Sequence, residues 1–150
     1  MSQDQSIWRC DRSIPSDTAA GRRVLGEVLE QLEALNWSRR EVFAVHLAME
    51  EALVNAIIHG NKLDVERKIR VACDLTAESI RIEIADEGDG FDPSTVPDPR
   101  KPDRLDTPSG RGVMLMKEFM TRVEFCDMGS RIVLEKDRMP AGRPDKRGAR

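Results

Sequence analysis

Hydrophobic and polar positions repeat with two different periods along this chain, and these periods predict its elements. Residues 6–13 alternate in character from one position to the next, which predicts a short strand. From a cap at Ser16 or Asp17 to about Leu35, apolar residues recur at three- and four-residue spacings. That spacing places them on one face and predicts an amphipathic helix.

A second and longer helix is predicted from about Arg39 to Ile58. Ser38 followed three residues later by Glu41 has the pattern of a capping box, which marks a helix start. The segment is apolar nearly all round, a pattern typical of a helix buried inside a protein. A Gly-Asn pair then ends it.

The middle of the chain predicts a hairpin followed by a long loop. Lys68 to Leu75 and Ser79 to Ala85 both alternate, and only three residues connect them. Residues 92–109 hold five of the eight prolines, so no regular element is expected there. Long loops inside compact domains are usually functional, and this one is interpreted as a lid.

The last third predicts one more helix, from Val113 to about Met120, and a final hairpin formed by residues 123–126 and 131–135. The order is therefore strand, two helices, two strands, lid, helix and two strands. This order predicts an α/β two-layer sandwich, with a mixed, mostly antiparallel sheet and the helices on one face.

Composition and charge narrow the function classes. The 150 residues fit one domain, and a net charge of −3 argues against direct nucleic-acid binding. Residues 137–150 carry five basic and two acidic side chains among prolines and glycines, so they are expected to form a basic, flexible tail.

The chain shows no pattern of a membrane or secreted protein. No apolar run approaches the ~18 residues of a membrane helix, and the polar N-terminus leads into no signal core. Cys10, Cys73 and Cys126 are far apart and make no metal-binding motif, so we expect free thiols in a reducing cytoplasm.

Three polar residues interrupt the long apolar helix. Glu51, Asn55 and His59 are spaced four residues apart and so share one stripe of the helix. They could form a solvent-facing edge or an internal hydrogen-bond network. They could instead line a ligand site, in which the Asn55 oxygen suits Mg²⁺ and Glu51 handles a proton beside a phosphate.

Two glycine-containing segments follow. Asp86, Gly88 and Gly90 come directly after the predicted second strand of the hairpin, where a plain β-turn is the simplest interpretation. The second segment opens the later helix, where backbone N–H groups favour an anion, although an ordinary loop-to-helix junction would look the same. It comprises Ser109, Gly110, Arg111 and Gly112.

In this order and spacing, the three segments resemble the N box and the two glycine boxes of the Bergerat-fold ATPases, the superfamily of gyrase, Hsp90, histidine kinases and MutL. Within it, the chain is most similar to the small anti-sigma factor serine/threonine kinases of bacteria. Their run Glu-Ala-x-x-Asn-Ala-x-x-His-Gly is intact at residues 51–60. The resemblance covers roughly residues 6–136.

The resemblance implies a function and roles for individual residues. It implies an ATP-binding kinase domain at residues 1–136, with the ATP lid at about 91–109 and the tail at 137–150. Glu51 is expected to be the general base, Asn55 the Mg²⁺ ligand, and Asp86 the acceptor for the adenine amino group. The other expected ATP contacts are Gly88, Gly90, Gly110, Arg111, Gly112 and Ser130.

The implied partners are a sigma factor and a STAS-type anti-anti-sigma protein that the kinase phosphorylates, and a homodimer is the family expectation. Two alternatives stay open. The chain could be the ATP-binding half of a histidine kinase-like system, although its two histidines, His46 and His59, both lie on the N-box helix. It could also be a non-catalytic module that senses ATP.

Overall fold

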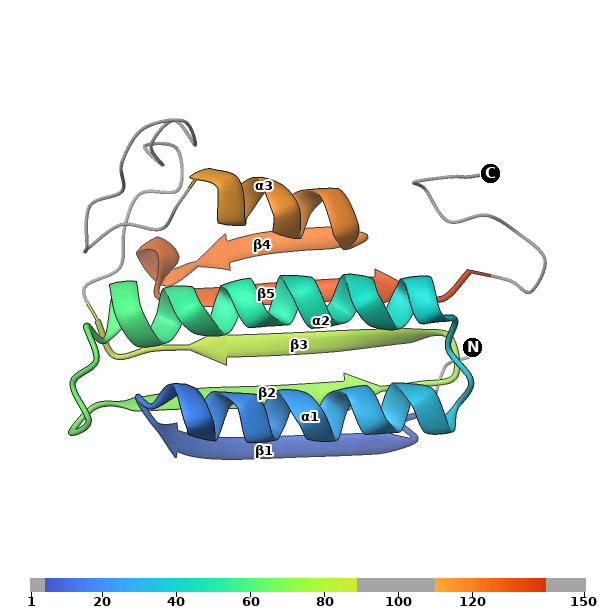
Figure 1. The fold of residues 1–150 in the computed structure, drawn as a ribbon, viewed down its shortest axis with the longest axis horizontal. Helices are drawn as coiled ribbons and strands as arrows, with labels where there is room; N and C mark the ends of the chain where they lie inside the picture. Colours follow the sequence, from blue (N-terminus) through green and yellow to red (C-terminus); the bar gives the residue numbers. More distant parts are fainter. Residues whose placement is uncertain (1–4, 89–109, 140–150) are drawn as a thin grey trace.

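A five-stranded sheet carries three helices on one of its faces (Figure 1). The computed structural model describes residues 5–88 and 110–139. The elements in chain order are β1 (Trp8–Pro15), α1 (Thr18–Ala34), α2 (Arg39–Val54), the π-helical segment η1 (Asn55–Gly60), β2 (Lys68–Leu75), β3 (Ser79–Ala85), α3 (Gly110–Phe119), β4 (Arg122–Cys126), the 3-10 turn η3 (Asp127–Gly129) and β5 (Arg131–Asp137).

The sheet confirms the predicted fold class. Its strand order is β1-β2-β3-β5-β4, and both predicted hairpins, β2–β3 and β4–β5, are present. All four strand pairings within the described residues are antiparallel, so the sheet is more regular than the mixed one expected. In Figure 1, α1 lies over β1 and β2, α2 over β3 and β5, and α3 over β4.

The core lies between the sheet and the helices. Alternate residues of β2 and β3 are fully buried, as expected for strands with one face against helices and one toward solvent. Helix α1 adds Val28 and Leu32, and α2 adds Val45 and Met49, all with no exposed surface. Asp17, not Ser16, caps α1, because its side chain accepts from the Ala19 N–H at 3.1 Å.

The start of α2 is fixed by the predicted capping box. The Ser38 hydroxyl accepts from the Glu41 N–H at 3.0 Å, and the Glu41 carboxylate accepts from the Ser38 N–H at 3.0 Å. The second carboxylate oxygen of this buried side chain accepts from the Met139 N–H at 2.6 Å. The box therefore also fastens the chain leaving β5 to the beginning of α2.

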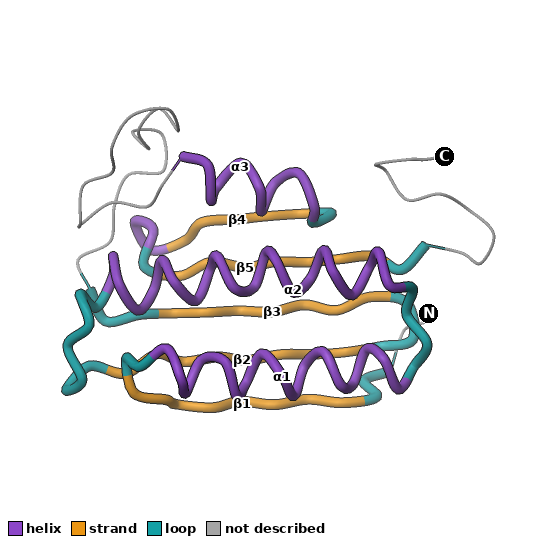
Figure 2. The backbone as a smooth tube through the Cα atoms, viewed as in Figure 1, coloured by secondary structure: helices purple, strands orange, loops and turns teal. Residues whose placement is uncertain are grey.

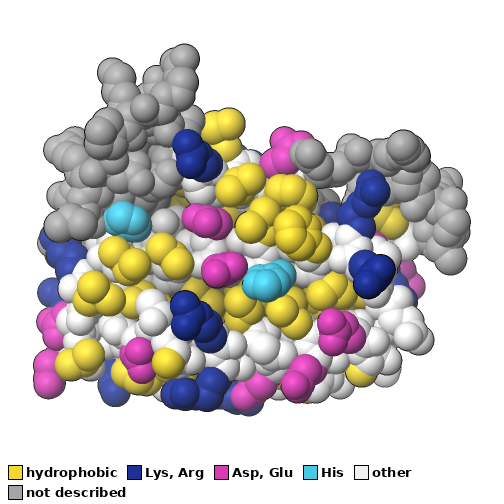
Figure 3. All heavy atoms as spheres, viewed as in Figure 1, with side chains coloured by type: hydrophobic (Ala, Val, Ile, Leu, Met, Phe, Trp, Pro, Cys, Tyr) yellow, Lys and Arg dark blue, Asp and Glu magenta, His cyan; other side chains and the backbone are white. Residues whose placement is uncertain are grey.

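The prediction that α2 is buried all round was wrong. Phe43 on its outer face is 55% exposed and packs edge-on against Phe119 of α3, with ring centroids 6.0 Å apart. In a two-layer fold nothing covers the side of a helix that faces away from the sheet. Hydrophobic side chains accordingly gather across the middle of this face (Figure 3).

By length and composition alone, the segment Arg39–Gly60 could cross a membrane. The core helix of a folded domain meets the same criteria. Here α2 packs between α1 and α3 over the sheet, and this packing accounts for its apolar character.

The first residues of the predicted tail, which begins at residue 137, contact the rest of the fold. Asp137 is the last residue of β5, and the Arg138 guanidinium lies 5.6 Å from the Trp37 ring. Arg138 also donates to the carbonyls of Leu35 and Asn36. Residues 140–150 of the predicted tail and the predicted lid at 91–109 lie outside the described residues.

Candidate functional site

Four segments that are distant in sequence meet at one end of the sheet (Figures 1 and 2). They are η1 at the end of α2, the end of β3 with the residues after it, the start of α3, and η3 between β4 and β5. Every described residue singled out in the sequence for ligand chemistry belongs to one of these segments or to the last turn of α2.

The end of α2 differs from the predicted helix. From Asn55 to Gly60 the backbone is π-helical, and the N–H of Asn61 donates to the carbonyl of Ala56, five residues earlier, at 2.8 Å. A π turn is wider than an α turn and often marks a functional site. Asn55 stands at the transition, so the polar stripe of Glu51 and Asn55 leads directly into the widened turn.

Asp86 packs against two glycines beside this turn. Its carboxylate accepts from the Gly88 N–H at 2.8 Å. A Cβ on Gly60 would overlap that carboxylate, and a Cβ on Gly88 would overlap the carbonyl oxygen of Gly60. Only glycine at both positions permits this approach, so the two glycines form a close-fitting cradle around Asp86.

Burial raises the pKa of Asp86 to about 6, against the lowering effects of the Gly88 N–H and of Arg67. The group is therefore an incompletely solvated carboxylate, which accepts from the Gly88 N–H within the described residues. Such a carboxylate suits an N–H donor on a ligand.

Asn61 holds the segments around Asp86 together, a role that the sequence did not reveal. Its fully buried amide donates to the Ser16 hydroxyl at 2.7 Å and to the Lys68 carbonyl at 3.0 Å, and it accepts from the Glu87 N–H at 2.8 Å. Ser16 donates onward to the Arg67 carbonyl at 2.8 Å. Because Ser16 is 45 residues from Asn61, no local pattern could have shown this link.

Glu51 lies against the first turn of α3. A Cβ on Gly112 would be 2.5 Å from Glu51 Oε1, so the glycine leaves room for the carboxylate. Burial raises the pKa of Glu51, as does the nearby Glu50, and His59 opposes the shift. A raised pKa makes Glu51 a better proton acceptor than a fully solvated carboxylate.

Asn55 has an unused amide. Its Nδ2 is buried and has no hydrogen-bond partner in the part of the chain that the structure describes. Buried side-chain polar atoms are normally satisfied, so this N–H donor is available to an acceptor atom of a ligand, such as a phosphate oxygen. The same part of the chain holds no cluster of three or more His, Cys, Asp or Glu side chains that could bind a metal alone. A cation at Asn55 would therefore take its other ligands from water and phosphate.

The remaining predicted residues are Gly110 and Arg111 in α3, Ser130 before β5, and Gly90. Gly110 is the first residue of α3 and Arg111 is exposed in its first turn, next to Glu51 on α2. The carbonyl of Ser130 accepts from the Asp86 N–H at 2.8 Å, while its hydroxyl donates to the Asp127 carbonyl at 2.9 Å. The structure thus brings the Ser130 backbone to the site. Gly90 lies outside the described residues.

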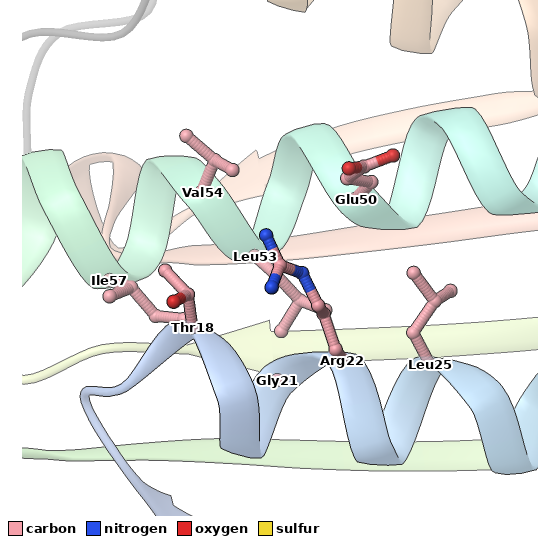
Figure 4. Close-up of a pocket in the computed structure, with 8 residues that line it drawn as sticks. All are labelled: Thr18, Gly21, Arg22, Leu25, Glu50, Leu53, Val54 and Ile57. Carbon is pink, nitrogen blue, oxygen red and sulfur yellow. The ribbon is translucent and has the colours of Figure 1, made fainter.

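A separate groove of about 60 Å³ lies between α1 and α2, where Arg22 reaches from α1 toward α2 (Figure 4). Sites for small molecules typically have volumes of about 300–1,000 Å³, so this groove is too small for a nucleotide. The residues that line it are Thr18, Gly21, Arg22, Leu25, Glu50, Leu53, Val54 and Ile57. It contains none of the predicted site residues.

Comparisons with known proteins identify the family to which this fold belongs. The model of the histidine kinase-like ATPase domain matches residues 14–136. The chain is 31% identical to the anti-sigma F factor of Clostridium novyi over 110 residues, which cover 70% of this chain and 77% of the relative. It is also 31% identical to the serine/threonine-protein kinase BtrW of Bordetella bronchiseptica over 91 residues, 59% of this chain and 64% of that kinase.

A solved structure has the same fold. The crystal structure of the RsbU and RsbW domains of Rv1364c from Mycobacterium tuberculosis aligns with a TM-score of 0.61 and 16% sequence identity. The alignment covers 89% of this chain and 34% of that one, so this chain spans about a third of that protein. The chain belongs to the histidine kinase-like ATPase family and, within it, to the anti-sigma factor kinases.

Proposed function

We propose that this protein is an ATP-dependent serine/threonine kinase that acts as an anti-sigma factor in a partner switch. The observation that carries the proposal is the contact of Glu51, four residues before Asn55, with Gly112 in the first turn of α3, at the same end of the sheet as Asp86. In this arrangement, Asp86 offers a hydrogen-bond acceptor for a nucleobase. Glu51 offers a proton acceptor beside the N-terminus of α3.

Asp86 is the residue proposed to recognise adenine. Its partly buried carboxylate would accept from the adenine amino group, and the absence of side chains at Gly60 and Gly88 lets this carboxylate pack closely against the backbone. The first turn of α3, with Gly110, Arg111 and Gly112, would face the phosphates, because the N–H groups at a helix start and the helix dipole favour anions.

Glu51 and Asn55 are proposed to share the chemistry. Glu51 would take the proton from the attacking serine or threonine hydroxyl, for which its raised pKa suits it. Asn55 would hold Mg²⁺ through its side-chain oxygen Oδ1. Its Nδ2, which has no partner among the described residues, would then donate to an acceptor on the nucleotide. When bound, Mg²⁺ neutralises charge on the ATP phosphates. Phosphoryl transfer depends mostly on such positioning and charge neutralisation.

The proposed partners follow from the relatives. An anti-sigma F factor and a serine/threonine kinase are among them, so we infer a sigma factor as one partner and a STAS-type anti-anti-sigma protein as the phosphorylated one. A homodimer and a cytoplasmic location, where ATP and sigma factors are found, complete the proposal.

The test is phosphate transfer from γ-labelled ATP to candidate STAS proteins in the presence of Mg²⁺. The proposal expects an acid-stable phosphoserine or phosphothreonine on the STAS protein. An acid-labile phosphohistidine on a partner would favour the histidine kinase-like alternative. Nucleotide binding with no phosphoprotein product from any STAS partner would favour a non-catalytic ATP sensor.

A further inference from the structure

Two of the three cysteines face each other across the edge of the sheet. Cys10 of β1 and Cys73 of β2 are directly opposed in the antiparallel register. Directly opposed residues project from the same face of a sheet. Ile14 lies on the same face of β1 as Cys10, and Val71 lies on the same face of β2 as Cys73. Both are buried, so this is the face that the helices cover. The pair therefore lies at the margin of the core, on the outermost strand pair.

The two thiols are already in contact. The Cys73 thiol donates a hydrogen bond to the Cys10 sulfur, and this bond lowers the pKa of Cys10 to about 7. The neighbouring Arg12 guanidinium acts in the same direction, while partial burial and Glu27 act against it. The same hydrogen bond, together with burial, raises the pKa of Cys73. Both effects favour the thiolate on Cys10 and the thiol on Cys73.

Their exposure differs in the way that a redox pair requires. Cys10 is partly exposed to solvent, whereas Cys73 is buried and only 4% exposed. Thiolate character with partial exposure, next to a second cysteine, is the environment of oxidation-sensitive thiols.

We propose that Cys10 and Cys73 form a redox site that peroxide closes, reversibly, into a disulfide across β1 and β2. The Cys10 thiolate attacks the O–O bond of hydrogen peroxide, which leaves a sulfenic acid on Cys10 and releases hydroxide. The Cys73 sulfur then attacks the Cys10 sulfur and displaces the second hydroxide, which takes the Cys73 thiol proton and leaves as water. The first hydroxide takes the proton that Cys10 released when it became a thiolate. Two thiols and one peroxide thus give one disulfide and two waters.

The backbone can accept this bond without rearrangement. Opposed residues of antiparallel strands have Cα atoms about 4.5 or 5.5 Å apart. Disulfides span Cα separations of roughly 4.4–6.8 Å. The product would lock the edge strand, which otherwise has a strand neighbour on only one side within the described sheet. In a reducing compartment such a bond would be transient and would report oxidant.

The experiment treats the reduced protein with stoichiometric hydrogen peroxide and follows free thiols, intact mass and peptide mapping. The proposal expects free thiols to fall from three to one, a mass loss of two hydrogens, and a single Cys10–Cys73 cross-linked peptide. Dithiothreitol should restore all three thiols.

Three variants sharpen the result. Cys126→Ser, the matched control on β4, should still lose two thiols. Cys73→Ser should instead accumulate a dimedone-reactive sulfenic acid at Cys10, and Cys10→Ser should leave Cys73 unoxidised. Preferential oxidation of Cys126, or disulfide-linked dimers in place of the internal bond, would overturn the proposal, as would unchanged thiols in the wild type. These readouts do not involve ATP, so they are independent of the kinase assignment.

Discussion

At the scale of single residues, the site contains polar groups whose solvation or hydrogen bonding is incomplete in the part of the chain that the structure describes. The Asp86 carboxylate is partly buried with a pKa of about 6, the Glu51 pKa is raised by burial, and the Asn55 amide nitrogen has no partner among the described residues. Each of these destabilises the ligand-free protein. We interpret them as groups retained for binding and catalysis at some expense in stability.

Replacing Asp86 by Asn should separate stability from binding. Asn keeps an acceptor for the Gly88 N–H but carries no charge, so the variant should unfold at higher temperature without nucleotide. Because solvent partly screens the carboxylate, the gain should be about 1 kcal/mol. ATP affinity should fall at least tenfold by calorimetric titration. A variant that binds ATP normally would contradict the adenine assignment.

The wild-type protein should show the corresponding pH dependence. The folded state holds the Asp86 proton more tightly than the unfolded chain, whose carboxyl has the ordinary pKa of 3.8. This group therefore lowers the free energy of unfolding as pH rises from about 4 to about 6. ATP affinity should change in the opposite direction and weaken as pH falls through about 6. The Asp86→Asn variant should lack both effects in unfolding and binding measurements.

Asn61 should matter for stability more than for chemistry. Replacement by Ala removes three hydrogen bonds and leaves the Lys68 carbonyl and the Glu87 N–H without their partner. The expected loss is about 3 kcal/mol in urea unfolding. Glu66→Ala, an exposed change in the neighbouring loop, should lie within about 0.5 kcal/mol of wild type. Equal effects of the two changes would mean that the buried amide network contributes nothing.

At the scale of elements, the site depends on how closely α2 and α3 approach each other. The π turn widens the end of α2 where the site begins, and Gly112 leaves the space that Glu51 occupies. The position of the carboxylate is therefore set by two helices that are far apart in the sequence.

Gly112→Ala tests this approach. The added methyl group would meet only the end of the flexible Glu51 side chain, so the fold should survive, with stability unchanged or up to about 1 kcal/mol higher. Displacement of Glu51 should nevertheless reduce phosphate transfer at least tenfold. Gly26→Ala in α1, where nothing lies within 4 Å, is the matched control and should stabilise the protein without changing activity. Full activity of Gly112→Ala would show that the position of Glu51 is not critical.

The elements also show how far sequence reasoning reached. The hairpins of 68–85 and 122–137 and the capping box of Ser38 and Glu41 depend on local periodicity and spacing, and all three were predicted. The π turn was missed because an apolar helical run continues through it without a break in period. The Asn61 network and the link from Glu41 to Met139 join residues far apart in the chain, so only the folded structure shows them.

At the scale of the whole molecule, the two faces differ in character. The side of the sheet away from the helices carries charged side chains in pairs, among them Arg70 with Asp11 and Arg131 with Glu83. Such exposed pairs contribute little stability, about 0–1 kcal/mol each, but they keep the face hydrated. The helical face carries an apolar band across its middle, with charged side chains around it (Figure 3), and the segments of the candidate site meet at one end of the sheet (Figure 1).

The central claim is that this end of the molecule transfers phosphate with Glu51 as base. Asn55→Ala should weaken Mg-ATP binding itself, because it removes the proposed metal ligand. Glu51→Gln keeps the shape and most hydrogen-bonding capacity of the side chain but cannot take a proton. The two residues lie four positions apart on one stretch of helix. Comparing the two variants therefore separates a loss of nucleotide binding from a loss of catalysis.

The most direct measurement is phosphate transfer by Glu51→Gln to the STAS partner, made beside a nucleotide-binding titration of the same preparation. The account predicts ATP affinity within a few-fold of wild type and a transfer rate lower by roughly 10²–10⁴. A Glu51→Gln protein that binds ATP and phosphorylates its partner at close to the wild-type rate would contradict the account.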